Sequence, residues 1–304
     1  MRCLLLLVFV AAATAADVPT SSDVDYIKNY HELVGIPLAA KIKAMEDQWL
    51  RNPLNRIIGG AASANINHPY MAGLVITLTT GGRTGCGATL LSSSRLVTAG
   101  HCWADSVNQA AQFEVVLGSQ YLFSGGTRII TNQVFTHPLF DRRNPLKYDV
   151  AMIYLPSRVT FSALISPVAL PSAAEVNDQF AGATATAIGY GKTSDAEVGL
   201  SLQTFRREVN VQVMAQPLCR ASWGAGVIEP YNLCTEGNRS NNNLNNVGVC
   251  GGDSGGPLTT FKNGRQILIG VISFAADGNC QSGYASGYTR VTSFLDFITQ
   301  HLQL

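Results

Sequence analysis

The chain has 304 residues, which is enough for one large or two small domains. Apolar residues make up 46% of it and charged residues 13%. The charged share is about half of what soluble domains usually carry. This argues against disorder and indicates a compact protein with a large core. The formal net charge of +1 gives no basis for binding to nucleic acid or to a membrane surface.

The first 16 residues have the pattern of a secretory leader. Arg2 precedes an apolar run over residues 4–10, and small residues follow as far as Ala16. The run is too short to cross a bilayer. A buried N-terminal strand is the alternative, but it fits the end rich in Ala and Thr poorly. We therefore expect residues 1–16 to be a signal peptide.

Residues 17–56 are charged and helix-prone, unlike the rest of the chain. One helical face carries four large apolar residues, at spacings of four, three and four: Leu38, Ile42, Met45 and Trp49. The segment is either a short solvated helix or a pro-peptide that keeps an enzyme inactive. The bond between Arg56 and Ile57 has the form of a tryptic cleavage site, which favours the pro-peptide. The segment has no cysteine, so no disulfide would retain it after cleavage.

From residue 57 onward, short apolar runs alternate with Gly, Asn, Ser and Pro. The clearest runs are 71–78, 88–91, 113–117, 150–155, 183–189, 209–214 and 266–274. Runs of this length between turn signals predict an all-β sandwich or barrel. The last residues differ, because Phe294, Leu295, Ile298 and Leu302 have helical spacing. We expect a packing helix at the C-terminus.

Three segments contain the residue types that nucleophilic catalysis requires: His101 in 98–102, Asp149 in 148–152 and Ser254 in 249–258. A serine hydroxyl is a weak nucleophile and needs a nearby base. Four glycines surround Ser254, and glycines allow positive φ and a close approach of backbone N–H groups to a substrate. A glycine-rich surface turn is the simpler alternative. The other histidines lack such a setting, and we interpret them as surface or loop residues: His31, His68, His137 and His301.

The cysteines indicate disulfides. Of seven, Cys3 leaves with the leader, and the remaining six allow fifteen pairings. Zinc binding would need a CxxC or HxxxH spacing, which the sequence lacks. We expect neither a metal nor a cofactor.

These segments, in this order and preceded by the activation sequence at 56–60, resemble the chymotrypsin/trypsin family of serine endopeptidases. They look closest to the digestive chymotrypsins of insects, and the resemblance extends from Ile57 to Leu304. It implies two six-stranded antiparallel Greek-key barrels and a C-terminal helix, with the active site in the cleft between the barrels. The first barrel would take up about 57–170 and the second, with the helix, about 171–304.

The resemblance also implies the roles of single residues. His101 would be the general base, Asp149 would orient it and Ser254 would be the nucleophile. Ser273 would donate a hydrogen bond to Asp149, and the backbone N–H groups of Gly252 and Ser254 would form the oxyanion hole.

Activation and the disulfide pattern follow from the same resemblance. Cleavage after Arg56 would free an α-ammonium on Ile57, which would pair with Asp253 and order the adjacent serine turn. The implied disulfides are Cys86–Cys102, Cys219–Cys234 and Cys250–Cys280.

By the same alignment, Gly248 forms the floor of the primary specificity pocket, and Ala275 and Ser286 form its walls. A floor without charge argues against cleavage after Lys or Arg. Relatives that accept aromatic residues usually have glycine at both walls, so this pocket is narrower. We expect chymotrypsin-like cleavage after Phe, Tyr, Leu or Met, with elastase-like or collagenolytic specificity as the alternative. A catalytically silent homologue fits less well, because the catalytic residues are all kept.

The expected partners are protein or peptide substrates, an activating trypsin-like protease and protein protease inhibitors. No nucleic acid or membrane partner is expected, and the protein should be a monomer. The setting should be extracellular, with a digestive role in a gut lumen. Asn238 begins a sequon for N-glycosylation.

Overall fold

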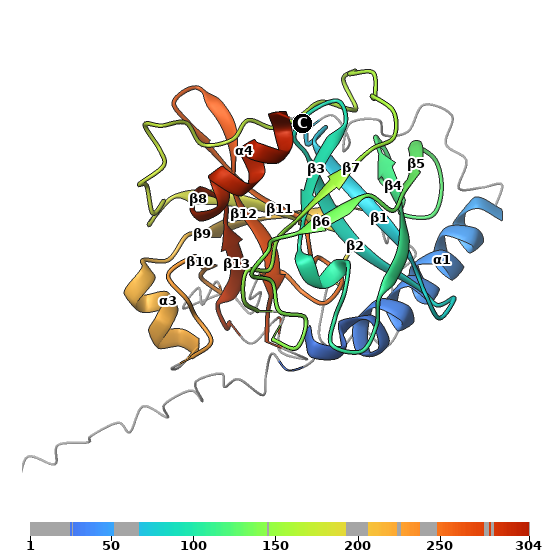
Figure 1. Ribbon diagram of the computed structural model, residues 1–304, viewed down its shortest axis with the longest axis horizontal. Helices are drawn as coiled ribbons and strands as arrows, with labels where there is room; N and C mark the ends of the chain where they lie inside the picture. Colours follow the sequence, from blue (N-terminus) through green and yellow to red (C-terminus); the bar gives the residue numbers. More distant parts are fainter. Residues whose placement is uncertain are drawn as a thin grey trace, which may run out of the picture.

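Two curled antiparallel sheets form the protein; in Figure 1 the strands of the first sheet lie on the right and those of the second on the left. The computed structural model describes residue 25 and residues 27–51, 67–144, 146–192, 206–223, 226–237, 248–276, 280 and 283–303. The signal peptide, the Arg56–Ile57 bond and the sequon at Asn238 lie outside these residues. In the part that is described, no helix is long and apolar enough to cross a membrane.

The first sheet has seven strands in the order β5-β4-β1-β2-β3-β7-β6. They are β1 (Met71–Leu78), β2 (Arg83–Leu90), β3 (Arg95–Thr98), β4 (Ala110–Leu117), β5 (Thr127–Thr131), β6 (Val134–Thr136) and β7 (Ala151–Tyr154). We expected six strands, and the extra one has a simple cause. The stretch 127–136 is interrupted after Thr131, whose hydroxyl accepts a bond from the Gln133 N–H (3.1 Å) and donates to the Tyr154 carbonyl (2.6 Å).

This interruption closes the first barrel. Before it, β5 pairs with β4 at one edge of the sheet, and after it, β6 pairs with β7 at the other edge. One short stretch of chain therefore joins both edges.

The second sheet has six strands in the order β10-β13-β12-β11-β8-β9. They are β8 (Thr184–Gly189), β9 (Arg207–Gln212), β10 (Asn232–Thr235), β11 (Pro257–Lys262), β12 (Arg265–Phe274) and β13 (Ser286–Arg290). A bridge between Val213 and Thr235 connects the ends of the two edge strands. The predicted fold class, two antiparallel barrels, is thus confirmed.

Helices cover the ends of the barrels. The second sheet is followed by a 3-10 turn, Val291–Phe294, and by the expected C-terminal helix, α4 (Leu295–Gln303). Of the predicted apolar positions, Phe294 and Ile298 are buried, while Leu295 and Leu302 are half-buried. Helix α3 (Gln216–Trp223) buries Cys219 and Trp223. Both helices are visible at the left and top of Figure 1.

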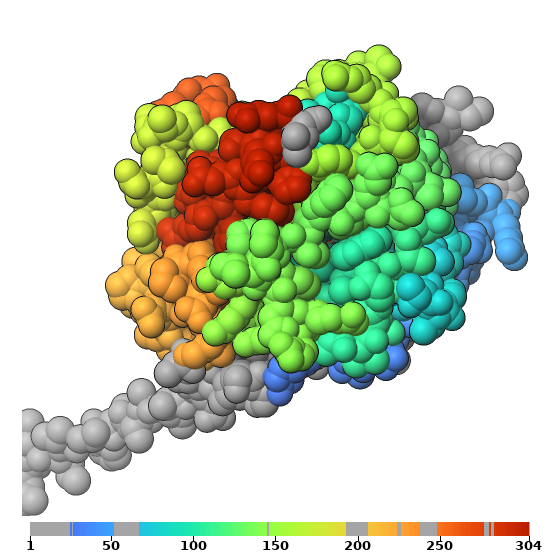
Figure 2. Space-filling view, viewed as in Figure 1, coloured from blue at the N-terminus to red at the C-terminus, as the bar shows by residue number. Residues whose placement is uncertain are grey.

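Part of the segment before residue 57 is folded onto the first barrel. It consists of a π-helical turn, η2 (His31–Gly35), that continues into α1 (Ile36–Arg51). Both lie along β2, and α1 is the blue helix at the lower right of Figure 1. In Figure 2 the blue atoms of this segment lie along the lower and right edge of the molecule. Of the predicted apolar face, Leu38 and Ile42 are buried while Met45 and Trp49 are half-buried. The segment is therefore not a solvated helix.

Candidate active site

Strand pairing brings His101 and Asp149 together. His101 lies in a 3-10 turn (Gly100–Cys102) just after β3, and Asp149 lies just before β7. Because β3 and β7 pair with Thr98 opposite Ala151, the two residues beyond these ends become neighbours. Asp149 Oδ2 accepts a hydrogen bond from His101 Nδ1 at 2.8 Å, and Oδ1 accepts one from the His101 backbone N–H at 2.9 Å. Both side chains are fully buried. These two bonds fix the orientation of the imidazole.

The second barrel contributes two more contacts to Asp149. The hydroxyl of Ser273, in β12, donates to Asp149 Oδ2 at 2.6 Å, as the sequence predicted. The hydroxyl of Thr289, in β13, donates to the Asp149 carbonyl at 2.7 Å. Nothing in the sequence pointed to Thr289, because its contact depends on how the two barrels meet. The aspartate is thereby held from both sides of the cleft.

The glycines around Ser254 are needed for a tight fit between the barrels. Gly252 and Gly255 have φ values of +101° and +78°, which favour glycine. The Ser254 carbonyl accepts a bond from the Gly87 N–H at 2.7 Å. A Cβ on Gly255 would lie 2.3 Å from the Thr98 hydroxyl, just before the His101 turn. The serine turn is therefore held beside the His101 turn.

His101 Nε2 and the Ser254 hydroxyl do not form a hydrogen bond in this structure. Within the described residues, His101 Nε2 is buried and has no hydrogen-bond partner. The ring of Tyr30, from the segment before residue 57, packs edge-on against the imidazole with ring centroids 4.9 Å apart. His101, Asp149 and Ser273 are thus assembled, while the ring nitrogen that would face a serine hydroxyl is unpaired.

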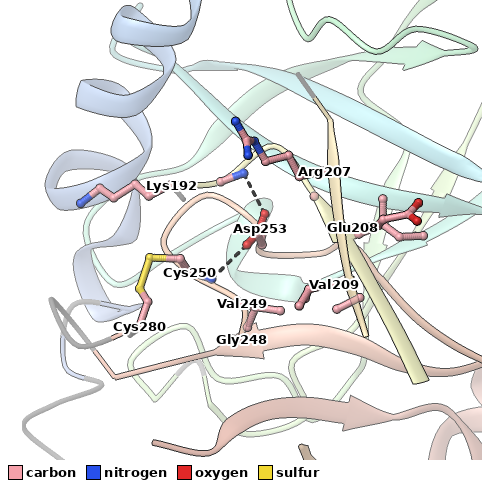
Figure 3. Close-up of a pocket in the computed structure, with 13 residues that line it drawn as sticks. Lys192, Arg207, Glu208, Val209, Gly248, Val249, Cys250, Asp253 and Cys280 are labelled. Atoms are coloured by element: carbon pink, nitrogen blue, oxygen red, sulfur yellow. Dashed lines mark hydrogen bonds between the residues drawn. A yellow bond between two sulfur atoms is a disulfide. The ribbon is translucent and has the colours of Figure 1, made fainter. Parts of the chain in front are cut away.

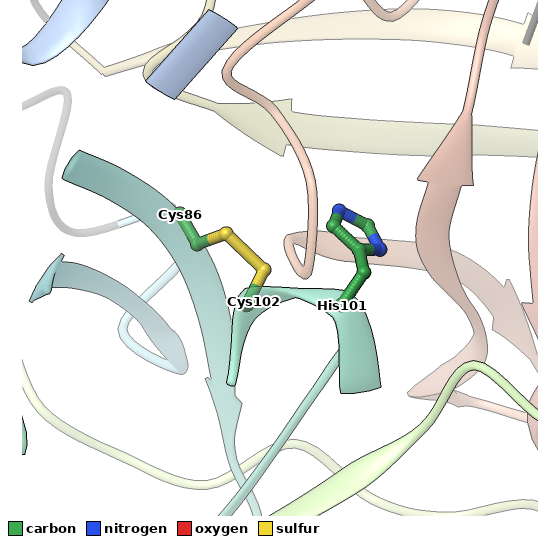
Figure 4. A group of neighbouring side chains, drawn as sticks. All are labelled: Cys86, His101 and Cys102. Carbon is green, nitrogen blue, oxygen red and sulfur yellow. A yellow bond between two sulfur atoms is a disulfide. The ribbon is translucent and has the colours of Figure 1, made fainter. Parts of the chain in front are cut away.

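His101 also lies near a pair of cysteines, drawn in Figure 4. The ligand atoms of Cys86, His101 and Cys102 lie within 4.8 Å of one another, a spacing that could hold a metal ion. The two sulfur atoms are, however, bonded to each other at 2.03 Å and offer no thiolate. All three implied disulfides are present: Cys86–Cys102, Cys219–Cys234 and Cys250–Cys280.

Of the three residues predicted to form the specificity pocket, Gly248 and Ser286 are in contact. A Cβ on Gly248 would lie 3.3 Å from Ser286 Oγ, so Gly248 lies beside the Ser286 side chain. Ala275 directly follows β12 and is buried. None of the three side chains carries charge.

Asp253 faces a cavity of about 250 Å³, shown in Figure 3. Its carboxylate accepts hydrogen bonds from the Gly191 N–H (2.7 Å) and the Cys250 N–H (2.9 Å). No cation of the described residues forms an ion pair with it; the Lys192 ammonium points away in Figure 3. Burial among protein atoms raises the pKa of Asp253 to about 6. The cavity therefore presents a carboxylate that a cation would stabilise.

The prediction that the remaining histidines are surface or loop residues was wrong for His31, which lies in η2 and is 0% exposed. His68 lies in the loop before β1, as expected, but it is buried, at 7% exposure. His68 Nδ1 is bonded to the Tyr70 hydroxyl at 2.8 Å, and its Nε2 is bonded to Glu208 at 2.5 Å. Glu208 is 140 residues away in sequence, so the pattern around His68 could not reveal it. His137 and His301 are half-buried.

Comparison with known proteins agrees with this geometry. Residues 57–298 match the Trypsin family. A collagenase from Hypoderma lineatum is 33% identical over 81% of this chain and 87% of its own length. Brachyurin from Leptuca pugilator is 33% identical over 80% of this chain and 96% of its own. A solved structure of HL collagenase superimposes with a TM-score of 0.68 at 30% identity, covering 82% of this chain and 99% of that one. With this fold and these relatives, the chain belongs to the trypsin family of serine proteases.

Proposed function

We propose that the protein is a secreted endopeptidase, made as a zymogen, that cleaves peptide bonds through an acyl-enzyme on Ser254. The observation that carries this proposal is the short, buried pair of His101 Nδ1 and Asp149 Oδ2, beside the glycine turn that holds Ser254. A buried carboxylate on Nδ1 keeps the proton there, so that Nε2 is free to accept one. That nitrogen is the one without a partner in the described structure.

The reaction follows from these positions. His101 Nε2 takes the proton of the Ser254 hydroxyl as Oγ attacks the substrate carbonyl carbon. The backbone N–H groups of Gly252 and Ser254 donate to the oxyanion that forms, each stabilising it by about 3–4 kcal/mol. His101 then gives its proton to the leaving amine, and the C–N bond breaks. Water repeats the sequence on the acyl-enzyme and releases the acid.

Activation is proposed to require cleavage between Arg56 and Ile57. Asp253 and its cavity support this step, because a buried carboxylate that pairs with no cation of the described residues is a suitable partner for a new α-ammonium. The pairing would order the adjacent Gly252–Ser254 turn. In this proposal residues 1–16 are the signal peptide, 17–56 the pro-peptide and 57–304 the peptidase domain.

The specificity proposed first is chymotrypsin-like, with Phe, Tyr, Leu or Met before the cleaved bond. It rests on the uncharged pocket residues Gly248, Ala275 and Ser286. Collagenolytic or elastase-like specificity is the second candidate, favoured by relatives that carry the names collagenase and brachyurin. A panel of peptide anilides distinguishes them: faster cleavage after Ala than after Phe or Leu would reject the first. We place the enzyme in a gut lumen, acting on dietary protein.

The experiment that tests the proposed reaction is replacement of the nucleophile. Ser254→Ala, in chain cleaved after Arg56, should still bind peptide substrates but lose turnover. The unchanged chain, cleaved in the same way, is the control. Turnover at the level of the control in the Ser254→Ala chain would refute the assignment.

A further inference from the structure

The segment before residue 57 makes three sets of contacts with the rest of the protein, and two of them involve groups that the proposed reaction uses. The Tyr30 ring packs against the His101 ring, and its hydroxyl donates to the Gly85 carbonyl at 2.8 Å. Tyr30 is fully buried there. A substrate would need the space beside the imidazole, because the leaving amine must reach Nε2. Tyr30 therefore fills space beside the imidazole that a substrate would need.

The second set of contacts covers the turn of the oxyanion hole. A Cβ on Gly252 would lie 2.1 Å from Leu38 Cδ2, so the Leu38 side chain lies directly on this glycine. Val34, one helical turn earlier, lies against Gly251. Both apolar side chains are buried, at 6% and 5% exposure for Val34 and Leu38. A bound peptide could not place its backbone over this turn while they remain.

The third set anchors the far end of the helix through a buried carboxylate. Glu46 is 3% exposed and accepts hydrogen bonds from the N–H groups of Leu122 (2.7 Å) and Phe123 (2.9 Å) and from the Ser124 hydroxyl (2.9 Å). A carboxylate among three donors is a specific recognition contact, since burying it without them would be costly. At the other end, the His31 N–H donates to Asp105 at 2.9 Å.

The backbone of the segment does not resemble that of a substrate. Tyr30 has helical angles (φ −55°, ψ −45°), and helix continues to Arg51. A helical backbone has its N–H and C=O groups engaged within the helix, so it cannot pair with the enzyme in extended form or offer a carbonyl to the serine. The segment can thus block the cleft without being cut there.

We propose that this face of the enzyme, formed by Thr84–Cys86, Asp105, Leu122–Ser124 and Gly251–Gly252, is a binding site for the excised pro-segment, which acts as a separable inhibitor after the Arg56–Ile57 bond is cut. The inference rests on the proposed function. It adds a second requirement for activity: the segment must dissociate after the Arg56–Ile57 bond is cut. Cutting the bond leaves every contact above in place, because all of them precede Arg51. The segment has no cysteine to keep it attached. Activity should then appear only as the segment dissociates.

The test uses the full chain, cut by limited trypsin treatment that is then stopped, with cleavage at Arg56 and an otherwise intact segment verified by mass. Specific activity on a peptide anilide is measured over a wide range of enzyme concentration. We expect low specific activity at high concentration and a rise on dilution, which yields a dissociation constant for the segment.

Two leucines of the segment provide a matched pair of variants. Leu38→Ala removes the contact with Gly252 and should raise the dissociation constant at least about tenfold, since a buried leucine contributes about 1.5–3 kcal/mol and 1.4 kcal/mol is a factor of ten. Leu33→Ala removes a side chain that is 60% exposed and should change the dissociation constant less than about twofold.

The outcomes separate the two proposals. Full specific activity at every concentration in the unchanged cleaved chain would overturn the inhibitor while leaving the protease intact. Equal effects of Leu38→Ala and Leu33→Ala would also overturn it. Absence of activity at every dilution, in the unchanged chain and in Leu38→Ala alike, would instead refute the proposed function.

Discussion

Binding of the pro-segment should weaken in acid, because of His31. This side chain is fully buried against the enzyme, with its Nδ1 3.3 Å from the Thr84 hydroxyl. Burial lowers the pKa of His31 from 6.5 to about 4; the Asp105 carboxylate opposes this shift, and the nearby His101 adds to it. The released segment exposes His31 and restores the ordinary pKa. Protons therefore bind the free segment more strongly than the docked one.

The sign and size of the effect follow from these two pKa values. Above pH 6.5 His31 is neutral in both states, and the affinity is at its full value. As pH falls from 6.5 towards 4, only the free segment is protonated, so the dissociation constant rises by up to tenfold per pH unit. Between pH 7 and pH 5 the expected increase is about twentyfold.

The assay must not depend on activity, because catalysis by a general base has a pH dependence of its own. We therefore use the Ser254→Ala chain cleaved after Arg56, and quantify by mass spectrometry the segment that passes an ultrafiltration membrane. The control is the same chain with His31→Asn, which keeps the backbone bond to Asp105 and cannot be protonated. Burial raises the pKa of Glu46, which weakens docking as pH rises, but this contribution is present in both chains. An equal pH dependence with and without His31 would refute the reasoning.

Three further changes test other contacts. Asp149→Asn should lower kcat by about ten-thousandfold, the loss seen for this change in the trypsin family, because the amide would favour the wrong tautomer of His101; a loss under tenfold in steady-state kinetics would contradict the assigned role. Glu46→Gln should raise the dissociation constant of the cleaved pro-segment at least about tenfold, since the amide nitrogen that replaces one carboxylate oxygen cannot accept the hydrogen bonds which that oxygen accepts; an unchanged dilution curve would count against the anchor. Gly35→Ala should favour helix in the free segment yet weaken docking, because its Cβ would lie 1.8 Å from the Thr84 hydroxyl; tighter docking in the same dilution assay would show that this close approach is unimportant.

The sequence predicted the features that depend on local chemistry. Gly252 and Gly255, on either side of Ser254, have backbone angles that few other residues adopt, and the apolar runs correspond to the strands. The resemblance correctly implied the contact of Ser273 with Asp149, although 124 residues separate them. That expectation came from matching Ser273 to the family's motif; the distance between the two residues along the sequence gave no indication of the contact.

What the sequence could not predict depends on contacts between distant segments. Glu46 reads as one of many charges on a helix, and only the fold reveals the N–H groups of the 122–124 loop that it meets. His31 was interpreted as a surface or loop residue for the same reason, whereas it is fully buried. Tyr30 gave no signal at all, since an aromatic residue before a helix is common. Its position against His101 follows from the packing of η2 along β2.

The most direct test of the account is covalent labelling of the active serine. A fluorophosphonate probe is added to the chain cleaved after Arg56 and diluted until the pro-segment has dissociated, and the labelled peptide is identified by mass spectrometry. The account predicts label on Ser254, slower labelling of the same sample when it is concentrated, and no label in Ser254→Ala. Absence of label after dilution, or label on another serine, would contradict it.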